Sequence, residues 1–226
     1  IDLIVANSEP DATNKRLSAD AVRTVFAANG KDIARAEAAG NSQLEILPHN
    51  TGPTNYRTTV NAPKFDCSFY PTGNSAEVCT AERKAKATRV PTVPTDSRGT
   101  QTVTAERMIA RFGQASGEIE TMTAAGGVKF NERDRNATAQ QMAFTESDGF
   151  VRLRGGEPTY WDSKARAKAR EIDLDTRGDK SSLRGGVSTT YYAAKQTRSA
   201  TPFASSQKPV FVTADSADID NANETA

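Results

Sequence analysis

The sequence has few of the residues that build a deep hydrophobic core or a reactive centre. Aromatic residues make up 7% of its 226 residues, and it contains two cysteines, one tryptophan and one histidine. No apolar run approaches the roughly 18 to 20 residues that a membrane span needs. Basic and acidic residues number 29 and 28, so the overall charge gives no reason to expect a nucleic-acid partner.

Motifs of common catalytic sites are also missing. The sequence has no G-x-S-x-G, H-E-x-x-H, P-loop or dinucleotide-binding pattern. His49 stands in a loop rich in proline, glycine and asparagine, with no second histidine to assist it. Asp173 and Asp175 alternate with apolar residues, which is typical of the solvated face of a strand rather than of a glycosidase acid pair. Two cysteines alone make no metal site. The sequence therefore predicts no enzyme, no metal and no cofactor.

What the sequence does contain is an internal repeat, which decides the fold when it is present. The tetrapeptide LRGG occurs at 153–156 and again at 183–186. A key alanine, followed seven residues later by phenylalanine, recurs at equal intervals in the first half of the chain, and shorter copies follow. The key alanines are Ala19, Ala62, Ala105, Ala139, Ala169 and Ala214. Each complete copy continues through a polar turn into a second segment, so the repeating unit has the size of a hairpin.

The repeated segments are predicted to be strands, although many are rich in good helix formers. In KARAKAR (164–170) small apolar residues alternate with charged ones, which is the period of a strand with two different faces. After each key alanine this alternation slips by one residue. A slip at the same place in every copy predicts a β-bulge or a corner, at which the strand bends.

Glycines punctuate the units in two ways. Single glycines fall between paired segments, where hairpin turns favour a positive φ angle; these are Gly30, Gly73, Gly117, Gly149 and Gly178. Paired glycines at 126–127, 155–156 and 185–186 fall inside the return segments. Glycine within a strand usually marks a bend or a close backbone approach.

The expected fold is all-β: an elongated, antiparallel, two-walled open β-jellyroll built from repeated hairpin units. Residues 1–192 are predicted to form the repeated region, 193–209 a linker, and 210–226 the truncated start of a further repeat. Because the sequence begins at Ile1 and ends inside this pattern, we interpret it as part of a longer protein. If the two walls close fully, their inner faces form only a core; if they stay parted, they form a long apolar groove.

The repeat resembles a known family. The stretches VTAERMIARFGQASGEIETMTAAGGVKF (103–130), 134–187 and 212–226 are similar to the OstA-like proteins of lipopolysaccharide transport, the LptA–LptC group. The resemblance implies a β-taco whose interior holds the acyl chains of lipopolysaccharide. It also implies a periplasmic protein that joins other Lpt-type jellyrolls through exposed edge strands, with an inner-membrane anchor compatible with a longer N-terminus.

Carried over position by position, the resemblance implies a set of groove-facing residues. They are Met108, Ala110, Phe112, Met122, Val128, Phe130, Met142, Phe144, Leu153, Ile172, Leu174, Leu183 and Val187. The expected ligand is therefore lipopolysaccharide or its lipid A part.

Three other features each have two interpretations. Cys67 and Cys79 are predicted to lie on the inner face, where a cross-strand disulfide and two buried thiols are both compatible with the pattern. The basic stripe Lys164, Arg166, Lys168 and Arg170 is interpreted as a soluble outer face, with a patch for anionic lipid as the alternative. Tyr160 and Trp161 either flank a groove mouth or cap the core.

Three functions compete at this point. The first is a non-enzymatic, periplasmic lipid-binding bridge that carries lipopolysaccharide towards the outer membrane. The second is a ligand-free structural or adhesin-like β-repeat whose interior is fully packed. The third is a polysaccharide-acting enzyme on a β scaffold. Because the inner face is rich in alanine and threonine and poor in aromatic residues, we favour an unfilled groove and the bridge.

Overall fold

A computed structural model describes residues 1–5, 14–48, 55–95, 99–178, 180–192 and 209–220. These residues form strands joined by turns and short irregular segments. The strands are β1 (Asp2–Val5), β2 (Asn14–Ser18), β3 (Ala21–Phe26), β4 (Ile33–Leu47), β5 (Tyr56–Phe69), β6 (Ala76–Pro91), β7 (Gln101–Phe112), β8 (Ile119–Glu132), β9 (Arg135–Thr145), β10 (Phe150–Arg154), β11 (Thr159–Trp161), β12 (Ala165–Lys168), β13 (Glu171–Asp175), β14 (Lys180–Tyr191) and β15 (Val210–Asp220). The predicted all-β class is confirmed, and the part of the chain that is described contains no helix able to span a membrane.

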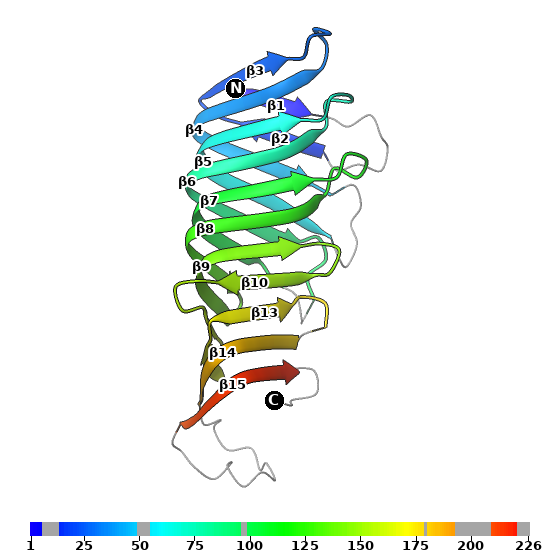
Figure 1. The fold of residues 1–226 in the computed structure, drawn as a ribbon. Coiled ribbons are helices and arrows are strands. Elements are labelled where there is room, and N and C mark those ends of the chain that lie inside the picture. The colour runs from blue at the N-terminus through cyan, green and yellow to red at the C-terminus, as the bar shows by residue number, and fades with distance from the viewer. Residues whose placement is uncertain (6–13, 49–54, 96–98, 179, 193–208, 221–226) are drawn as a thin grey trace.

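All fifteen strands belong to one sheet, and every pairing is antiparallel. Consecutive strands lie side by side, so the chain climbs steadily along the long axis, with the N-terminus near one end and the C-terminus near the other (Figure 1). Three strands are interrupted. β2 and β3, which both pair with β4, are the halves of the first. β10 and β11 are the halves of one return strand, and β12 and β13 are the halves of the next outgoing strand. The strand order is therefore that of stacked hairpins.

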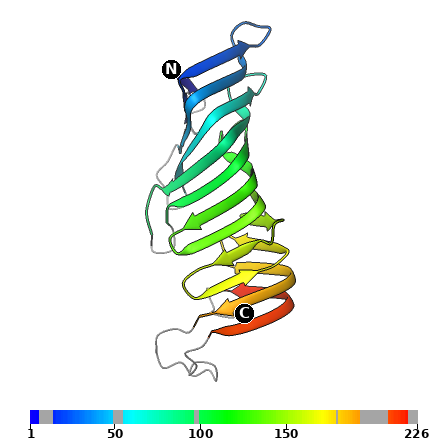
Figure 2. The ribbon, with the colours of Figure 1, turned by 90° about the vertical axis from the view of Figure 1, so that its left-hand side faces the viewer.

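The sheet is folded lengthwise into two walls that face each other (Figures 1 and 2). The first wall consists of Asp2–Val5, Asn14–Ser18, 42–47, 56–61, 85–91, 101–105, 128–132, 135–139, Thr159–Trp161, Ala165–Lys168, 187–191 and 210–214. The second wall consists of Ala21–Phe26, 33–39, 64–69, 76–82, 107–112, 119–125, 141–145, Phe150–Arg154, Glu171–Asp175, 180–184 and 216–220. The predicted two-walled architecture is confirmed.

The fold line between the walls lies where the sequence predicts a bend. The pairing register shifts between Asn61 and Lys64 in β5 and between Thr104 and Arg107 in β7, just around two key alanines. On the return strands the shift coincides with backbone in the left-handed region, which glycine adopts without steric cost. Those residues are Gly40, Arg83, Lys84, Gly126, Gly127, Gly155, Gly156, Gly185 and Gly186. The glycine pairs are thus the return-strand half of three corners, whereas β4 has Gly40 alone and β6 has Arg83 and Lys84.

The hairpin turns follow the glycine pattern with one exception. Gly30, Gly73, Gly117 and Gly149 have positive φ angles between 65° and 83°. Gly178 does not, so the prediction for this turn is wrong. The turn is instead shaped by the Asp175 side chain, whose Oδ1 accepts hydrogen bonds from the backbone N–H groups of residues 177 and 178. A side chain that mimics a turn hydrogen bond removes the need for a positive φ angle.

The doubled LRGG motif joins each return strand to the next strand. Arg154 Nη1 donates to the carbonyl of its own neighbour and to that of Ile172 at 3.2 Å, and lies 2.6 Å from an oxygen of Asp173. Arg184 repeats this arrangement with the carbonyl of Ala217 at 3.2 Å and with Asp218 at 2.7 Å. The arginine therefore links two neighbouring strands beside the corner, where the bend interrupts the regular backbone hydrogen bonds between them.

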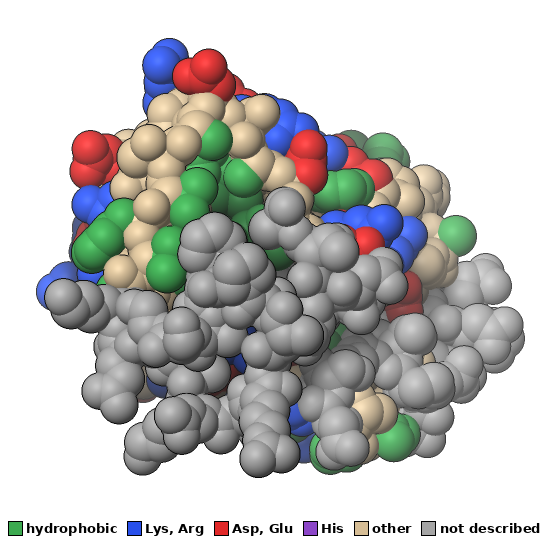
Figure 3. All heavy atoms as spheres, turned by 90° about the horizontal axis from the view of Figure 1, so that it is seen from below, with side chains coloured by type: hydrophobic (Ala, Val, Ile, Leu, Met, Phe, Trp, Pro, Cys, Tyr) green, Lys and Arg blue, Asp and Glu red, His purple; other side chains and the backbone are tan. Residues whose placement is uncertain are grey.

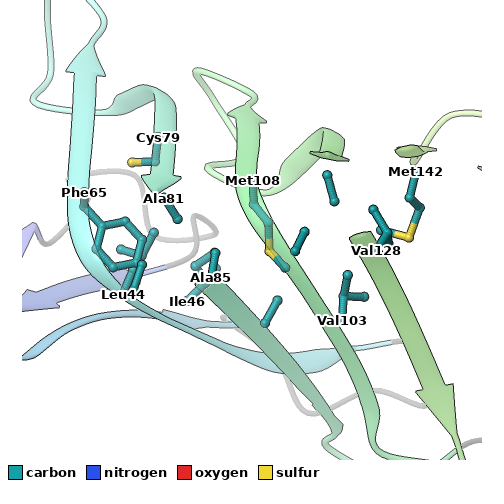
Figure 4. Close-up of a cluster of buried hydrophobic side chains, with 14 of the residues drawn as sticks. Leu44, Ile46, Phe65, Cys79, Ala81, Ala85, Val103, Met108, Val128 and Met142 are labelled. Carbon is teal, nitrogen blue, oxygen red and sulfur yellow. The ribbon is translucent and has the colours of Figure 1, made fainter. Parts of the chain in front are cut away.

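The core lies between the walls and is built largely from small residues. Key alanines Ala62, Ala105, Ala139 and Ala169 are all buried along the fold line. Farther from it larger side chains meet across the interior: Leu44 of the first wall and Phe65 of the second point toward one another (Figure 4). Small residues at the apex let the two walls converge, because a large side chain there would force them apart.

The predicted linker, 193–209, lies almost wholly outside the described residues. β15 follows it and pairs with β14 along both walls, from Tyr191–Val210 to Lys180–Asp220. The strand thus continues the same sheet as the preceding units, and 221–226 lie outside the described part.

Candidate functional site

The inner face of the second wall carries two unbroken rows of side chains that run across neighbouring strands. The first row is Val22, Ala38, Phe65, Ala81, Met108, Ala124, Met142, Leu153, Ile172, Leu183 and Ala217. The second row, one step nearer the open edge, is Thr24, Ala36, Cys67, Cys79, Ala110, Met122, Phe144, Val151, Leu174, Ser181 and Ile219. Together they form an apolar lane along the length of the molecule.

The first wall faces this lane with a similar surface. Its apolar row runs Leu17, Leu44, Val60, Ala87, Val103, Phe130 and Ala137. Val128 and Val187 lie closer to the fold line, and both are buried. The interior is therefore apolar on both sides for most of its depth.

The structure places all thirteen predicted groove residues on the inner faces of the walls. Those that are buried are Met108, Phe112, Val128, Met142, Phe144, Leu153, Ile172, Leu183 and Val187. Ala110, Met122, Phe130 and Leu174 are partly buried and pack against that core.

The space between the walls is narrow in this structure. Between Leu44, Val60, Phe65 and Met108 the gap amounts to about 20 Å³, which is room for about one water molecule. Nearer the open edge lies a cleft of about 180 Å³, lined by residues that include Tyr56, Arg89, Ile119, Met122 and Phe144. The cleft is therefore wider than the gap beneath it, and the walls would have to part for the two spaces to be of equal width.

Apolar side chains are also exposed at the C-terminal end of the sheet. Figure 3 shows hydrophobic side chains exposed at this end, with charged side chains at its outer rim. Phe211 and Val212 of β15 are exposed there, while Ala217 and Ile219 of the same strand pack against the core. Apolar surface that is exposed at an end strand is typical of a contact site.

The mouth of the groove is bordered on the first wall by a row of mostly polar residues. Cross-strand pairing aligns Lys15, Ile46, Thr58, Arg89, Gln101, Glu132 and Arg135. We call these seven residues the mouth row. Like the residues of the apolar row they face inward, but they lie two residues farther along each strand from the fold line. The groove is therefore apolar at its floor and charged at its opening.

Lys15 crosses the mouth from the first wall to the second. Its side chain is buried, with 7% of the residue exposed. Nζ donates a hydrogen bond of 2.6 Å to the carbonyl of Gly117 and lies 4.7 Å from the centre of the Phe112 ring. Burial lowers the pKa of Lys15 to about 8, and the nearby carboxylate of Glu118 acts in the opposite direction.

Arg89 also reaches across the mouth of the groove. Its guanidinium lies 4.3 Å from the ring centre of Tyr56 on the first wall and 5.7 Å from that of Phe144 on the second. Beside it, Gln101 Oε1 accepts from Arg89 at 3.3 Å, and Gln101 Nε2 donates to the buried carboxylate of Glu132 at 3.1 Å. Stacked on aromatic rings, a guanidinium can lie at an apolar boundary and keep its charge.

Cys67 and Cys79 form a disulfide between β5 and β6. They lie directly opposite each other in the pairing register and face the lane, in the row that continues to Ala110 and Met122. The bond fixes two neighbouring strands of the second wall to each other beside the narrow central gap.

The remaining predicted features lie outside the groove or at its border. Lys164, Arg166, Lys168 and Arg170 are all exposed, whereas the alanines between them point inward. Trp161 is half-buried and stacks with Arg166 at 5.7 Å, and Tyr160 packs against the core. Asp173 pairs with Arg154 on the outer face. His49 lies outside the described residues, among which no group of three potential ligands could hold a metal ion.

Sequence reasoning did not identify Lys15 and Arg89 as functional residues. The signal was present: Lys15 shares its two-residue phase with Leu17, and Arg89 shares it with Ala85 and Ala87. Both charged residues thus occupy inward positions of their strands.

A known protein family matches part of the chain. Residues 95–180, from the residues before β7 to the start of β14, match the family described as LptA/(LptD N-terminal domain) LPS transport protein. Over these residues the chain matches an OstA-like, LptA-type family. The predicted family is confirmed, and because its members are transport proteins, so is the prediction of a non-enzymatic protein.

Among solved structures, the chain is similar to LptH, the LptA homologous periplasmic component of the conserved lipopolysaccharide transport device from Pseudomonas aeruginosa. The two share 11% sequence identity over 88% of this chain and 93% of that one, with a TM-score of 0.31. No curated protein sequence matches the chain.

Proposed function

We propose that this LptA-type protein binds lipopolysaccharide in the periplasm and passes it along the groove, with the acyl chains on the apolar lane. The observation that carries the proposal is the continuity of the two rows on the second wall, which no charged side chain interrupts from β3 to β15. Burial of an acyl chain contributes roughly 0.8 kcal/mol per methylene. A lipid could thus move along the lane with its chains shielded from water at every step.

Two further observations support the compartment and the mode of assembly. The Cys67–Cys79 disulfide is suited to an oxidising compartment such as the periplasm. β1 and β15 lie at opposite ends of the sheet, and each pairs with a single neighbouring strand in the described part of the chain. Edge strands of this kind can accept a strand from another jellyroll protein, so we propose them as the joints of a bridge.

A ligand-free structural repeat is the second candidate, because one observation favours it. The central interior is nearly filled in this structure, with a gap of only about 20 Å³. The two functions differ in whether the walls part for a lipid.

Site-specific photo-crosslinking in living Gram-negative cells separates them. A photoreactive residue replaces Phe112 or Phe144, which face the groove, and its matched control replaces Arg111 or Arg170, which are exposed. We expect adducts with lipopolysaccharide at the two inner positions and none at the outer ones. A folded, periplasmic protein that gives no adduct at any position would show that the chain is a packed repeat.

A further inference from the structure

We propose that Lys15 and Arg89 form a binding site for the anionic, phosphate-type head of the amphiphile whose chains enter the groove. This inference rests on the proposed function and assigns to the mouth row a role in recognising the head. The two cations are three register steps apart on the first wall, through Ile46 and Thr58. With neighbouring strands about 4.8 Å apart, this places them on the order of 15 Å from each other along the mouth.

Arg89 borders the cleft near the open edge of the groove. The floor of this cleft of about 180 Å³ includes Met122 and Phe144, and the guanidinium stacks on the Phe144 ring at 5.7 Å. A chain lying on that floor brings its polar end to the level of Arg89. A planar guanidinium can bind a phosphate through two parallel hydrogen bonds.

Lys15 adds a cation that already crosses the mouth. Its Nζ donates to a neutral acceptor, the Gly117 carbonyl on the opposite wall, at 2.6 Å. A phosphate oxygen is a stronger partner for an ammonium group than a carbonyl is. When the ligand's head takes this hydrogen bond, the link to Gly117 is lost, and the walls are free to part beside the narrow interior.

The acidic residues of the cleft fix the direction of the head. Glu118 and Glu146 lie on the tips of the second wall, and Glu146 is paired with Arg177 at 3.1 Å. The charge of Glu118 opposes an anion at the tip of the second wall, whereas Lys15 and Arg89 attract it to the mouth between the walls. The groove therefore holds the chains on its apolar rows and the head at the level of the mouth row.

The test compares two probes that differ only in charge: a monoacylglycerol phosphate and the monoacylglycerol with the same chain. Binding to the full chain is measured by calorimetry for the wild type, Lys15→Met, Arg89→Met and the double variant. Lys168→Met, which removes an exposed cation of the outer stripe, is the matched control. We expect the wild type to bind the phosphate probe about tenfold more tightly than the neutral one. Each single inner variant should lose part of this ratio and the double variant should lose all of it; the ratio is compared because the substitutions can change binding of the acyl chain itself.

The possible outcomes are distinct. Rescue by Arg89→Lys and a preference that weakens with salt in the wild type would support the site without relying on the methionine variants. Equal loss for both probes would mean that the cations only hold the walls, and loss in Lys168→Met alone would move the site to the outer stripe; either result overturns the inference. If the wild type binds the neutral probe but shows no preference, the head site is wrong and the lipid groove stands. If it binds neither probe, both fall.

Discussion

At the scale of single residues, position relative to the fold line decides what a side chain can do. Next to the line only small residues such as Ala85 and Ala105 fit between the converging walls. One step out, larger apolar residues such as Val103 fill the widening space. At the third inward position the walls are far enough apart for a long charged residue, whose stem lies on apolar surface while its head reaches the boundary. Lys15 and Arg89 both lie at this level.

The burial of Lys15 predicts a specific pH dependence. Its pKa is 10.5 in a solvated chain and about 8 in the fold. Between these values the unfolded chain binds a proton here that the folded chain does not, so the free energy of unfolding rises with pH across this window. We expect the wild type to gain roughly 3 kcal/mol relative to Lys15→Met between about pH 7 and about pH 10.5. Urea unfolding of both proteins at the two pH values measures it, and a constant difference would show that the ammonium is as well solvated folded as unfolded.

Alternation alone was enough to predict most groove residues, because a period of two fixes the face of a strand. Met108, Leu153 and Ile172 follow from it directly. It also assigns Arg89 to the inner face, but a charged residue in an alternating strand normally indicates the solvated side. Only the three-dimensional distance from the fold line shows that an inward position can also be a mouth position, and the sequence does not contain that distance.

At the scale of strands, the corner is the feature that organises the repeat. Three return segments cross it with a glycine pair and β4 crosses it with Gly40, whereas β6 crosses it with Arg83 and Lys84, whose φ angles are 67° and 65°. The strands were predictable despite helix-forming residues because alternation and the recurrent slip outweigh propensity. The residues that form the corner of β6 could not be predicted, since no glycine marks them.

The exception leads to a stability prediction. In the left-handed region a residue with a side chain destabilises the folded state by roughly 1–2 kcal/mol. Glycine avoids this strain, but it also gives the unfolded chain more conformational freedom, which offsets part of the gain in stability. We expect the double change Arg83→Gly and Lys84→Gly to stabilise the protein by about 1 kcal/mol, measured as a rise in the urea midpoint.

Lys86→Gly is the matched control for this change, because Lys86 is an equally exposed cation in the regular ladder of β6. There glycine should destabilise the fold by roughly 0.5–1 kcal/mol. If all three glycine substitutions destabilise the protein, the corner of β6 does not carry the backbone strain inferred for it.

At the scale of the whole molecule, the fold is quasi-one-dimensional. Each strand pairs with its neighbours along the axis, and the two walls add contacts across the interior, so stability is a sum of local terms. The Cys67–Cys79 disulfide and the crossings made by Lys15 and Arg89 all lie among β2 to β9. The repeat and the two-walled architecture could be predicted from the sequence. The gathering of the disulfide and of the Lys15 and Arg89 contacts in the N-terminal part of the sheet could not, because it depends on which ends of the strands lie opposite each other across the mouth.

This arrangement predicts a gradient of amide hydrogen exchange along the axis. β5 to β8 have paired strands on both sides and should exchange slowest, whereas β1, β3 and β15 have one neighbour each and should open first. Mass-spectrometric exchange on the full chain measures this order. Repeating it at a higher protein concentration tests the edges as joints: slower exchange in β1 and β15 alone would indicate strand addition between copies. Uniform protection from end to end would instead mean that the walls open as one cooperative unit, and that the units do not fold as a linear array.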